Sequence, residues 1–289
     1  MENEHVFFQG APQQQHPRAS GPAPRARPGT GGRAERIDDF VAWLFDLGGL
    51  PADQYRTDAL ERRLPACMRM LRAGSVSEAR NAIKAQPRLA SAALGALLLG
   101  VTTFCRDKNV FEELRAKALP DLLGRFGRLR IWSAACSDGR ELYSLAILLA
   151  EAGRLRECQL LGTDCRWDAV FQAREGIYSA EMLGPLKRSL RDAFFLPEGG
   201  GMRATDTLRE ALRWKRANLF SHAEPGPWHL IMWRNMAIYL NLTAAEGIWT
   251  KLVAELARGG ILVTGKADHP PRTLPLLRLG NCTYMRTNN

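Results

Sequence analysis

The sequence predicts an α/β protein in which helices cover a sheet, preceded by a small all-helical domain. Two observations lead to this fold class. From about residue 128 onward, apolar runs alternate with helical segments, whereas every segment between Ile37 and Leu99 has helical periodicity. Alternation of strands and helices is typical of a parallel or mixed sheet covered on both faces.

The first 35 residues are rich in Gln, Pro, Gly, Arg and Ala, and they contain too few large apolar side chains to form a core. We therefore predict a disordered tail over residues 1–35. Because this segment lacks the basic-then-apolar order of a secretory signal, a cytoplasmic location is expected. The apolar run LASAALGALLLGVTTF ends at Cys105, short of the roughly 20 residues that span a bilayer, so we expect no membrane insertion.

Residues 36–107 are predicted to form the helical N-terminal domain. Its four helical segments are IDDFVAWLFDLGGL, DALERRLPACMRMLRAG, SVSEARNAIKAQ and RLASAALGALLLG. Ser75, followed three residues later by Glu78, is typical of a capping box at a helix start. Arginines are dense around the second segment: Arg56, Arg62, Arg63, Arg69 and Arg72. They form either a solvated face or a docking surface for an acidic partner, and both alternatives stay open.

Residues 108–289 are predicted to form the α/β domain. We expect strands in RLRIWSAAC, CQLLGTDC, HLIMW, GGILVTG and CTYMRT, and helices in LYSLAILLAEAG, DAVFQAREGIY and AAEGIWTKLVAELA. The glycine-rich and then charged stretch at about 194–217 interrupts this alternation. It is predicted to be an inserted small subdomain, as a hairpin or antiparallel appendage.

The stretch WSAACSDGRELYS, residues 132–144, joins an apolar strand to a helix through small residues and Gly139. Many α/β proteins hold a nucleotide-like ligand at such a turn. A single glycine, instead of the three of GxGxxG, favours a ligand without a pyrophosphate. The next strand ends at Asp164, where an acid would accept hydrogen bonds from both ribose hydroxyls; a helix N-cap is the alternative role.

Charge and cysteine content narrow the classes of partner. The net charge of +10 and the pI of about 9.7 suit either nucleic acid or an acidic protein surface. No RRM, KH or zinc-finger signature is present, nor an aromatic-flanked motif for a flipped base, so no nucleic acid is expected as a partner. The six cysteines include no CxxC pair, and we expect no metal site.

Six sequence blocks together resemble one family. They are TTFCRD (102–107), WSAACSDGRELYSLA (132–146), LLGTDC (160–165), AREGIYSAEML (173–183), RANLF (216–220) and WRNMAIYL (233–240). In this order they are similar to the CheR-type chemotaxis receptor methyltransferases, with the similarity running from about residue 37 to the end. The resemblance implies a Rossmann-like domain with a mixed seven-stranded sheet that uses S-adenosylmethionine (SAM) and releases S-adenosylhomocysteine (SAH). The implied reaction forms methyl esters on glutamate side chains of chemoreceptor-like proteins, and the implied partner is an acidic helical cytoplasmic domain.

The resemblance also implies a set of cofactor-binding residues: Thr102, Arg106, Ala135, Gly139, Glu141, Asp164, Asn218, Leu219, Arg234 and Asn235. Thr102 and Arg106 would approach the methionine end of SAM, and Glu141 its ammonium. Asn218 and Leu219 would flank the adenine. One acid and one arginine on opposite sides of a pocket suit the zwitterionic tail of the cofactor.

Two residues are predicted to be catalytic, Arg106 and Tyr239. A glutamate side chain is already ionised at pH 7, since its reference pKa is about 4.3, so the reaction needs alignment and not a general base. Arg106 would hold the acceptor carboxylate, as an alternative to the cofactor's own, and Tyr239 would face the reacting methyl. The structural alternatives are an ion pair of Arg106 with Asp107 and a core position for Tyr239.

The sequence departs from the family's pattern in and beside the cofactor loop. The family usually has glycine at Ala135, threonine at Asp138, an acid at Arg140, proline at Leu142, phenylalanine at Cys105 and often an acid at Arg166. Asp138 and Arg140 change local charge in opposite directions, and a pair between them would leave the net field unchanged. Two other functions stay open: a cofactor-binding regulatory protein without turnover, and a methyltransferase for a different acceptor.

Overall fold

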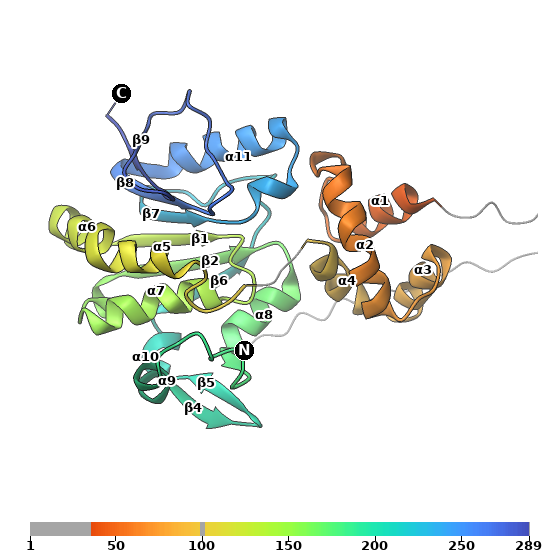
Figure 1. The fold of residues 1–289 in the computed structure, drawn as a ribbon, viewed down its shortest axis with the longest axis horizontal. Coiled ribbons are helices and arrows are strands. Elements are labelled where there is room, and N and C mark those ends of the chain that lie inside the picture. Colours follow the sequence, from red (N-terminus) through yellow and green to blue (C-terminus); the bar gives the residue numbers. More distant parts are fainter. Residues whose placement is uncertain (1–35, 99–101, 289) are drawn as a thin grey trace, which may run out of the picture. The chain divides into compact units, whose positions relative to one another are not determined.

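The structure is a computed structural model that describes residues 36–98 and 102–288. The predicted tail, residues 1–35, lies outside these ranges. Residues 36–98 form four α-helices (Figure 1): α1 (Ile37–Leu47), α2 (Thr57–Leu71), α3 (Val76–Ala85) and α4 (Leu89–Leu97). Each lies within a segment that was predicted to be helical, except that α2 begins one residue earlier. At the start of α3, Ser75 Oγ accepts a hydrogen bond from Glu78 N at 3.2 Å, as the capping-box motif predicts.

The buried positions of α2 show why this segment is helical. Leu60, Leu64, Cys67 and Leu71 recur every three to four residues and are buried against the other helices. Such spacing places apolar side chains on one face of a helix. Arg62, Arg69 and Arg72 are exposed, so the basic side chains of α2 remain available to solvent or to a partner.

Within residues 102–288, seven strands form the large sheet in the order β6-β2-β1-β7-β8-β10-β9. Their bounds are β1 (Arg130–Ala134), β2 (Gln159–Asp164), β6 (Leu212–Arg216), β7 (Trp228–Trp233), β8 (Leu256–Thr264), β9 (Leu276–Arg278) and β10 (Thr283–Arg286). The strands from β6 to β8 are parallel, and β10 is antiparallel to β8 and β9. The predicted mixed seven-stranded sheet is confirmed.

Helices follow most of the parallel strands, as the alternation of the sequence predicts. Apart from two short helices that flank a small antiparallel sheet, the α-helices of this domain are α5 (Lys108–Glu113), α6 (Leu119–Phe126), α7 (Arg140–Glu151), α8 (Trp167–Glu175) and α11 (Leu242–Glu255), and a π-helical turn (Leu114–Ala118) joins α5 to α6. Figure 1 shows α5, α6 and α7 grouped together, whereas α11 lies beside β7 and β8. No helix in the described part of the chain is long and apolar enough to span a bilayer.

A small antiparallel sheet accounts for most of the predicted insertion. It consists of β3 (Ile177–Tyr178), β4 (Phe195–Glu198) and β5 (Gly201–Ala204), flanked by α9 (Arg188–Phe194) and α10 (Asp206–Arg209). Residues 212–216 of the predicted insertion instead form β6 at the edge of the large sheet. Charged side chains alternate with Leu212 and Trp214 in this edge strand, so its sequence resembles a charged loop. The small sheet therefore extends beyond the predicted bounds at its start, since it includes Ile177–Tyr178, and its segment ends before Leu212, and not at residue 217.

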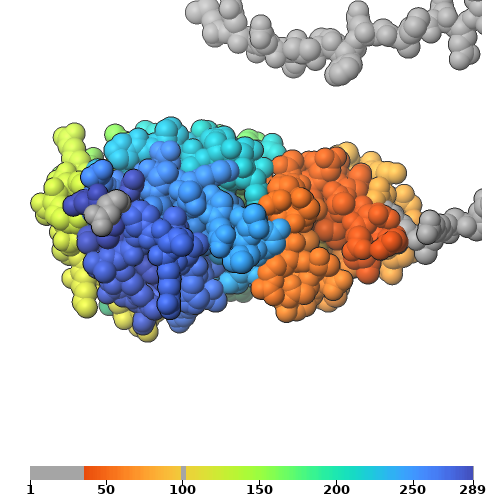
Figure 2. All heavy atoms as spheres, turned by 90° about the horizontal axis from the view of Figure 1, so that it is seen from above, coloured from red at the N-terminus to blue at the C-terminus, as the bar shows by residue number. Residues whose placement is uncertain are grey.

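The helical domain contacts the loop and helix that follow β7. Arg56 N donates to Tyr239 O at 2.9 Å, and Asn241 Nδ2 donates to Asp53 O at 2.9 Å. In Figure 2 the orange spheres of the helical domain adjoin the light-blue spheres of this region. As a result, the connection between α1 and α2 lies beside the carboxyl ends of the parallel strands.

Candidate active site

A groove runs across the carboxyl ends of β1, β2 and β7, where the order of the strands reverses. Such a switch point is where open α/β sheets bind ligands. Two adjoining hollows make up the groove, and they share Ala135, Asp164, Cys165 and Met236. The predicted residues that line the first hollow are Thr102, Arg106, Ala135, Glu141, Asp164, Arg234 and Asn235, and the second adds Asn218 and Leu219.

The first hollow is ionic, and Arg234 organises it. This side chain is 1% exposed; its guanidinium donates to Glu141 Oε2 at 3.0 Å and to Asp107 Oδ2 at 2.9 Å. A third bond reaches the carbonyl oxygen of Arg106 at 2.8 Å. Asp107 pairs with Arg234 and Lys266, and Arg106 lines the hollow. The fork of Arg234 thus joins the segment before α5 to the first turn of α7.

Asp164, the last residue of β2, lies between the two hollows and is 6% exposed. Its Oδ2 accepts from Ser137 N at 2.9 Å, and its Oδ1 accepts from Arg166 N at 3.0 Å and Nε at 3.1 Å. The N-cap of α8 is Arg166, so the alternative role of Asp164 as that cap is wrong. Arg166, where the family often has an acid, forms an ion pair with Asp164.

The loop after β1 follows an unusual backbone path. Ala135, Ser137 and Gly139 all have positive φ, at 56°, 54° and 86°. A Cβ on Gly139 would lie 2.7 Å from Trp214 and 2.8 Å from the Ala173 Cβ, so glycine is needed for packing there. Gly139 itself lines neither hollow among the described atoms.

The predicted pair across this turn is present. Arg140 and Asp138 form an ion pair at 2.6 Å between Nη2 and Oδ2, and both side chains are largely buried. Tyr178 donates its hydroxyl to the carbonyl oxygen of Asp138 at 2.8 Å and supports the turn from β3. The two departures from the family therefore compensate each other locally.

Replacing Ala135 with glycine, the residue that the family usually has there, tests how much the alanine destabilises the fold. A non-glycine residue at positive φ is strained by about 1 kcal/mol or more. We expect Ala135→Gly to raise the free energy of unfolding by about 0.5–1 kcal/mol in urea denaturation and to leave SAH affinity intact or improved. Ala152→Gly is the matched control, because Ala152 has a φ of −80° and gains nothing from glycine. Equal effects of the two substitutions would contradict this prediction.

The second hollow is apolar, and the helical domain contributes to it. Leu50 and Tyr55 line it together with Leu219 and Phe220. The ring of Tyr55 lies 5.6 Å from that of Phe220 and 4.9 Å from that of Phe45. Leu50 and Tyr55 could not be predicted from the sequence as groove residues, because they come from another domain and belong to none of the motifs that identify the groove.

Asn218 and Tyr239 each take part in local structure that the sequence did not indicate. Asn218 Nδ2 donates to Gly49 O at 2.9 Å, and its Oδ1 accepts from Phe220 N at 3.0 Å. Tyr239 ends a 3-10 turn (Ala237–Tyr239) and is half-buried. It lines neither hollow among the described residues, so its catalytic role stays a prediction.

The two cysteines of the groove, Cys136 in the first hollow and Cys165 in both, are poor nucleophiles. Burial, with a further contribution from Asp164, raises the pKa of Cys165 to about 12. Burial also raises the pKa of Cys136 well above its ordinary value. Both thiols therefore remain protonated at neutral pH. Since the thiolate is the reactive form of cysteine, these two residues act by packing.

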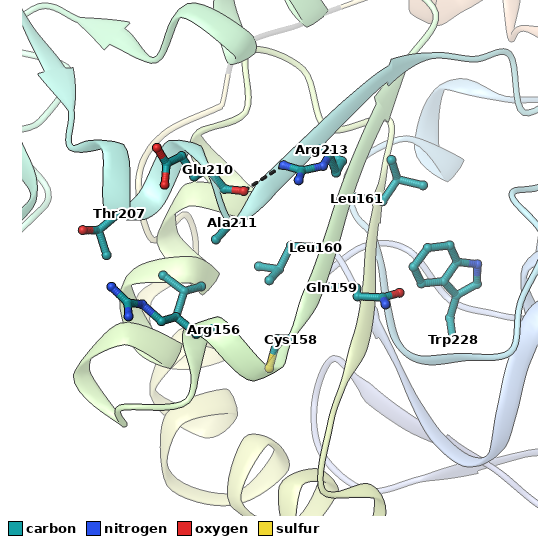
Figure 3. Close-up of a pocket in the computed structure, with 11 residues that line it drawn as sticks. Arg156, Cys158, Gln159, Leu160, Leu161, Thr207, Glu210, Ala211, Arg213 and Trp228 are labelled. Atoms are coloured by element: carbon teal, nitrogen blue, oxygen red, sulfur yellow. Dashed lines mark hydrogen bonds between the residues drawn. The ribbon is translucent and has the colours of Figure 1, made fainter.

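A larger hollow of about 610 Å³ lies elsewhere, between the amino-terminal parts of β2 and β6 (Figure 3). Exposed Arg156, Gln159 and Arg213 border it, and Arg213 donates to the carbonyl oxygen of Glu210 at 2.7 Å. None of the predicted site residues line it. Its size therefore says nothing about the chemistry of the groove.

The groove suits an elongated ligand with an ionic end, a diol and a flat apolar end. Arg234 lines the ionic hollow, and its buried Nε has no hydrogen-bond acceptor among the described atoms, so one donor of this side chain stays unpaired at that end of the groove. Asp164 offers carboxylate oxygens midway, and Tyr55 and Phe220 supply aromatic surface beyond it. These are the groups that SAM requires for its amino-acid tail, ribose and adenine.

The strand order, with one antiparallel strand near the edge, and this groove define a Rossmann-like SAM-dependent methyltransferase. Residues 100–277 match the family described as the CheR methyltransferase SAM-binding domain, and the chain belongs to that family. The fold class, the family and the use of SAM that the sequence predicted are confirmed.

Curated relatives agree with this assignment. A chemotaxis protein methyltransferase of Listeria innocua is 28% identical over 83% of this chain and 92% of its own length. Chemotaxis protein methyltransferase 2 of Pseudomonas aeruginosa is 29% identical over 83% of this chain and 89% of its own length. A Salmonella typhimurium relative of the same description is 28% identical over 78% and 81%. The similarity thus includes the helical domain as well as the α/β domain.

Proposed function

We propose that this protein methylates glutamate side chains in the cytoplasmic helical domains of chemotaxis receptors, and that it does so in the cytoplasm. The observation that carries the proposal is the family match over the groove, joined to relatives named chemotaxis protein methyltransferases. Three exposed arginines support an acidic partner: Arg62 and Arg69 of α2, and Arg72 directly after it. Opposite charges on two proteins mainly increase the rate at which they associate and set their relative orientation, and they add less to the affinity.

The residues of the groove would act by binding and alignment. SAM, when bound, supplies an electrophilic methyl group on a sulfonium. Glu141 and Arg234 would hold the amino-acid tail, Asp164 the ribose hydroxyls, and Tyr55 with Phe220 would cover the adenine and exclude water. The acceptor carboxylate is ionised at neutral pH, so no residue has to remove a proton from it. Orientation of the two reactants is then the main source of rate, on the order of 7–11 kcal/mol for well-aligned pairs.

Arg106 and Tyr239 are proposed to handle the acceptor. Arg106 lines the ionic hollow and carries the charge that a carboxylate needs. Tyr239 lies on the turn after β7, and its carbonyl oxygen accepts from Arg56 N at 2.9 Å beside the start of the basic helix α2. A receptor helix docked on α2 would therefore approach the same turn.

Methyl transfer to receptor fragments tests this proposal. The full chain is incubated with methyl-labelled SAM and a receptor cytoplasmic fragment whose acceptor positions are glutamate, and with a matched fragment whose acceptors are glutamine. We expect base-labile label on the glutamate fragment alone. Saturable SAH binding without any transfer would favour the regulatory alternative. Labelling of both fragments would favour a different acceptor. Labelling of another protein, with neither fragment labelled, would favour the same conclusion.

A further inference from the structure

The turn after β8, Gly265–Asp268, meets the loop that follows β7. Asp268 is 1% exposed and is the centre of this contact. Its Oδ2 accepts from Gly265 N at 3.1 Å and from Asn235 N, and its Oδ1 accepts from Ile238 N at 3.3 Å. One buried carboxylate thus binds two backbone amides of the β7 loop and one of its own turn.

The β7 loop needs such support because of its conformation. Asn235 has a φ of 58°, in the left-handed region that few non-glycine residues adopt. A strained backbone of this kind persists where surrounding contacts hold it. Arg234, Asn235 and Met236 all line the cofactor groove, so the path of this loop sets the shape of the groove wall.

The approach of the two segments is close enough to restrict the sequence. A Cβ on Gly265 would lie 2.8 Å from Asn235 N and 2.5 Å from Asp268 Oδ2, so a side chain there would displace one of them. Lys266, in the same turn, pairs with Asp107 at 3.2 Å. Asp107 in turn pairs with Arg234 at 2.9 Å. The turn therefore contacts two of the segments that supply the ionic hollow, the β7 loop and the segment before α5.

We infer that Asp268 is a positioning residue for the cofactor: it fixes the backbone of Asn235 and Ile238 and thereby holds the β7 loop in the shape that binds SAM. The inference rests on the SAM binding of the proposed function and not on the identity of the acceptor. Asp268 does not line the groove and acts only through the loop.

The protonation of Asp268 gives a signature of this role. Burial raises the pKa of Asp268 above its ordinary value, while its backbone hydrogen bonds and Arg234 act in the opposite direction. A protonated carboxyl group is a poorer acceptor for amides, so the hold on the loop weakens as the pH falls toward this raised pKa. Arg234 of the β7 loop acts on the charge of Asp268, and Lys266 and His269 flank Asp268 in the sequence. Asp107, from the segment before α5, pairs with both Arg234 and Lys266.

SAH titration of the full chain tests the inference. Asp268→Asn keeps the size of the side chain but removes an ionised acceptor, and we expect about tenfold weaker SAH binding. Asp268→Glu keeps the charge but lengthens the side chain, and we expect about threefold weaker binding. Asp192→Asn, an exposed carboxylate of α9 that pairs at the surface with Arg188, is the control and should bind as the wild type does.

Two readouts separate positioning from general stability. Acidification from pH 7.5 to 5 should weaken SAH binding more in the wild type and in His269→Gln than in Asp268→Asn. Hydrogen exchange should quicken at Asn235 and Ile238 in Asp268→Asn. If the folded Asp268→Asn protein binds SAH with wild-type affinity, even with a lower Tm, the inference is overturned. If that variant does not fold, wild-type SAH affinity of Asp268→Glu would overturn it. Loss of SAH binding by the wild type itself would instead count against the proposed function.

Discussion

Replacing Asp164 with alanine is expected to weaken SAH binding by a hundredfold or more. Asp164 lies midway along the groove, and hydrogen bonds to a charged group are worth about 1.5–3 kcal/mol each. Loss of the two proposed ribose hydroxyl contacts would therefore amount to about 3 kcal/mol or more, which corresponds to a factor above a hundred in Kd. Calorimetric titration of the purified chain with SAH measures this directly.

A second variant separates lost binding from lost stability. Asp164→Ala leaves the largely buried guanidinium of Arg166 without its partner, and a buried charge without a partner is destabilising. The double variant Asp164→Ala with Arg166→Met removes that charge. It should regain most of the stability in urea denaturation but none of the SAH affinity. SAH binding within threefold of the wild type in either folded variant would contradict the assigned role of Asp164.

The parallel strands of the large sheet were predictable to different degrees. The apolar runs LRIW and HLIMW overlap β1 and β7, and a strand buried on both faces needs such a continuous apolar sequence. β6 differs because it lies at the edge, where Arg213, Lys215 and Arg216 reach solvent. Alternating charges are normal for an edge strand but cannot be told from a loop without knowing its neighbour.

The groove was predictable where its residues stand at strand ends. Asp164 and Arg234 each lie at or directly after the carboxyl end of a parallel strand, and the ends of neighbouring parallel strands meet at one edge of the sheet. Tyr55 and Leu50 could not be predicted in this way. They precede the basic helix of another domain, and only the packing of that domain against the β7 loop brings them to the groove.

The ion pairs of the site also differ in whether the sequence could predict them. Asp138 and Arg140 are two residues apart in a turn, so their pairing could be predicted from local sequence, and it is present at 2.6 Å. Arg234 and Glu141 are far apart in the chain and come from different motifs. Their contact depends on the register of β7 beside β1, which places the end of one strand next to the helix that follows the other. The pairing of Arg234 with Glu141 therefore cannot be predicted from the pattern of charges in the local sequence.

Arg234 is the residue whose loss we expect to destabilise the protein most. Arg234→Met keeps much of the apolar volume but leaves Glu141 and Asp107 as poorly compensated carboxylates, with exposed fractions of 11% and 19%. Breaking a buried ion pair by removing one partner costs about 3–5 kcal/mol. We therefore expect Arg234→Met to lower the free energy of unfolding by about this amount in urea denaturation and to abolish SAH binding.

Arg234→Lys tests whether the planar fork matters beyond the charge. A lysine ammonium cannot donate in parallel to Glu141, Asp107 and the Arg106 carbonyl oxygen with the geometry of a guanidinium. It should regain part of the stability but little of the SAH affinity. Arg188→Met is the control, because its surface pair with Asp192 is exposed and should change stability by less than about 1 kcal/mol. If Arg234→Met were no more destabilising than this control, Arg234 would not be the organiser of the ionic hollow, and the tail of SAM would have to be held by Arg106 and Glu141 alone.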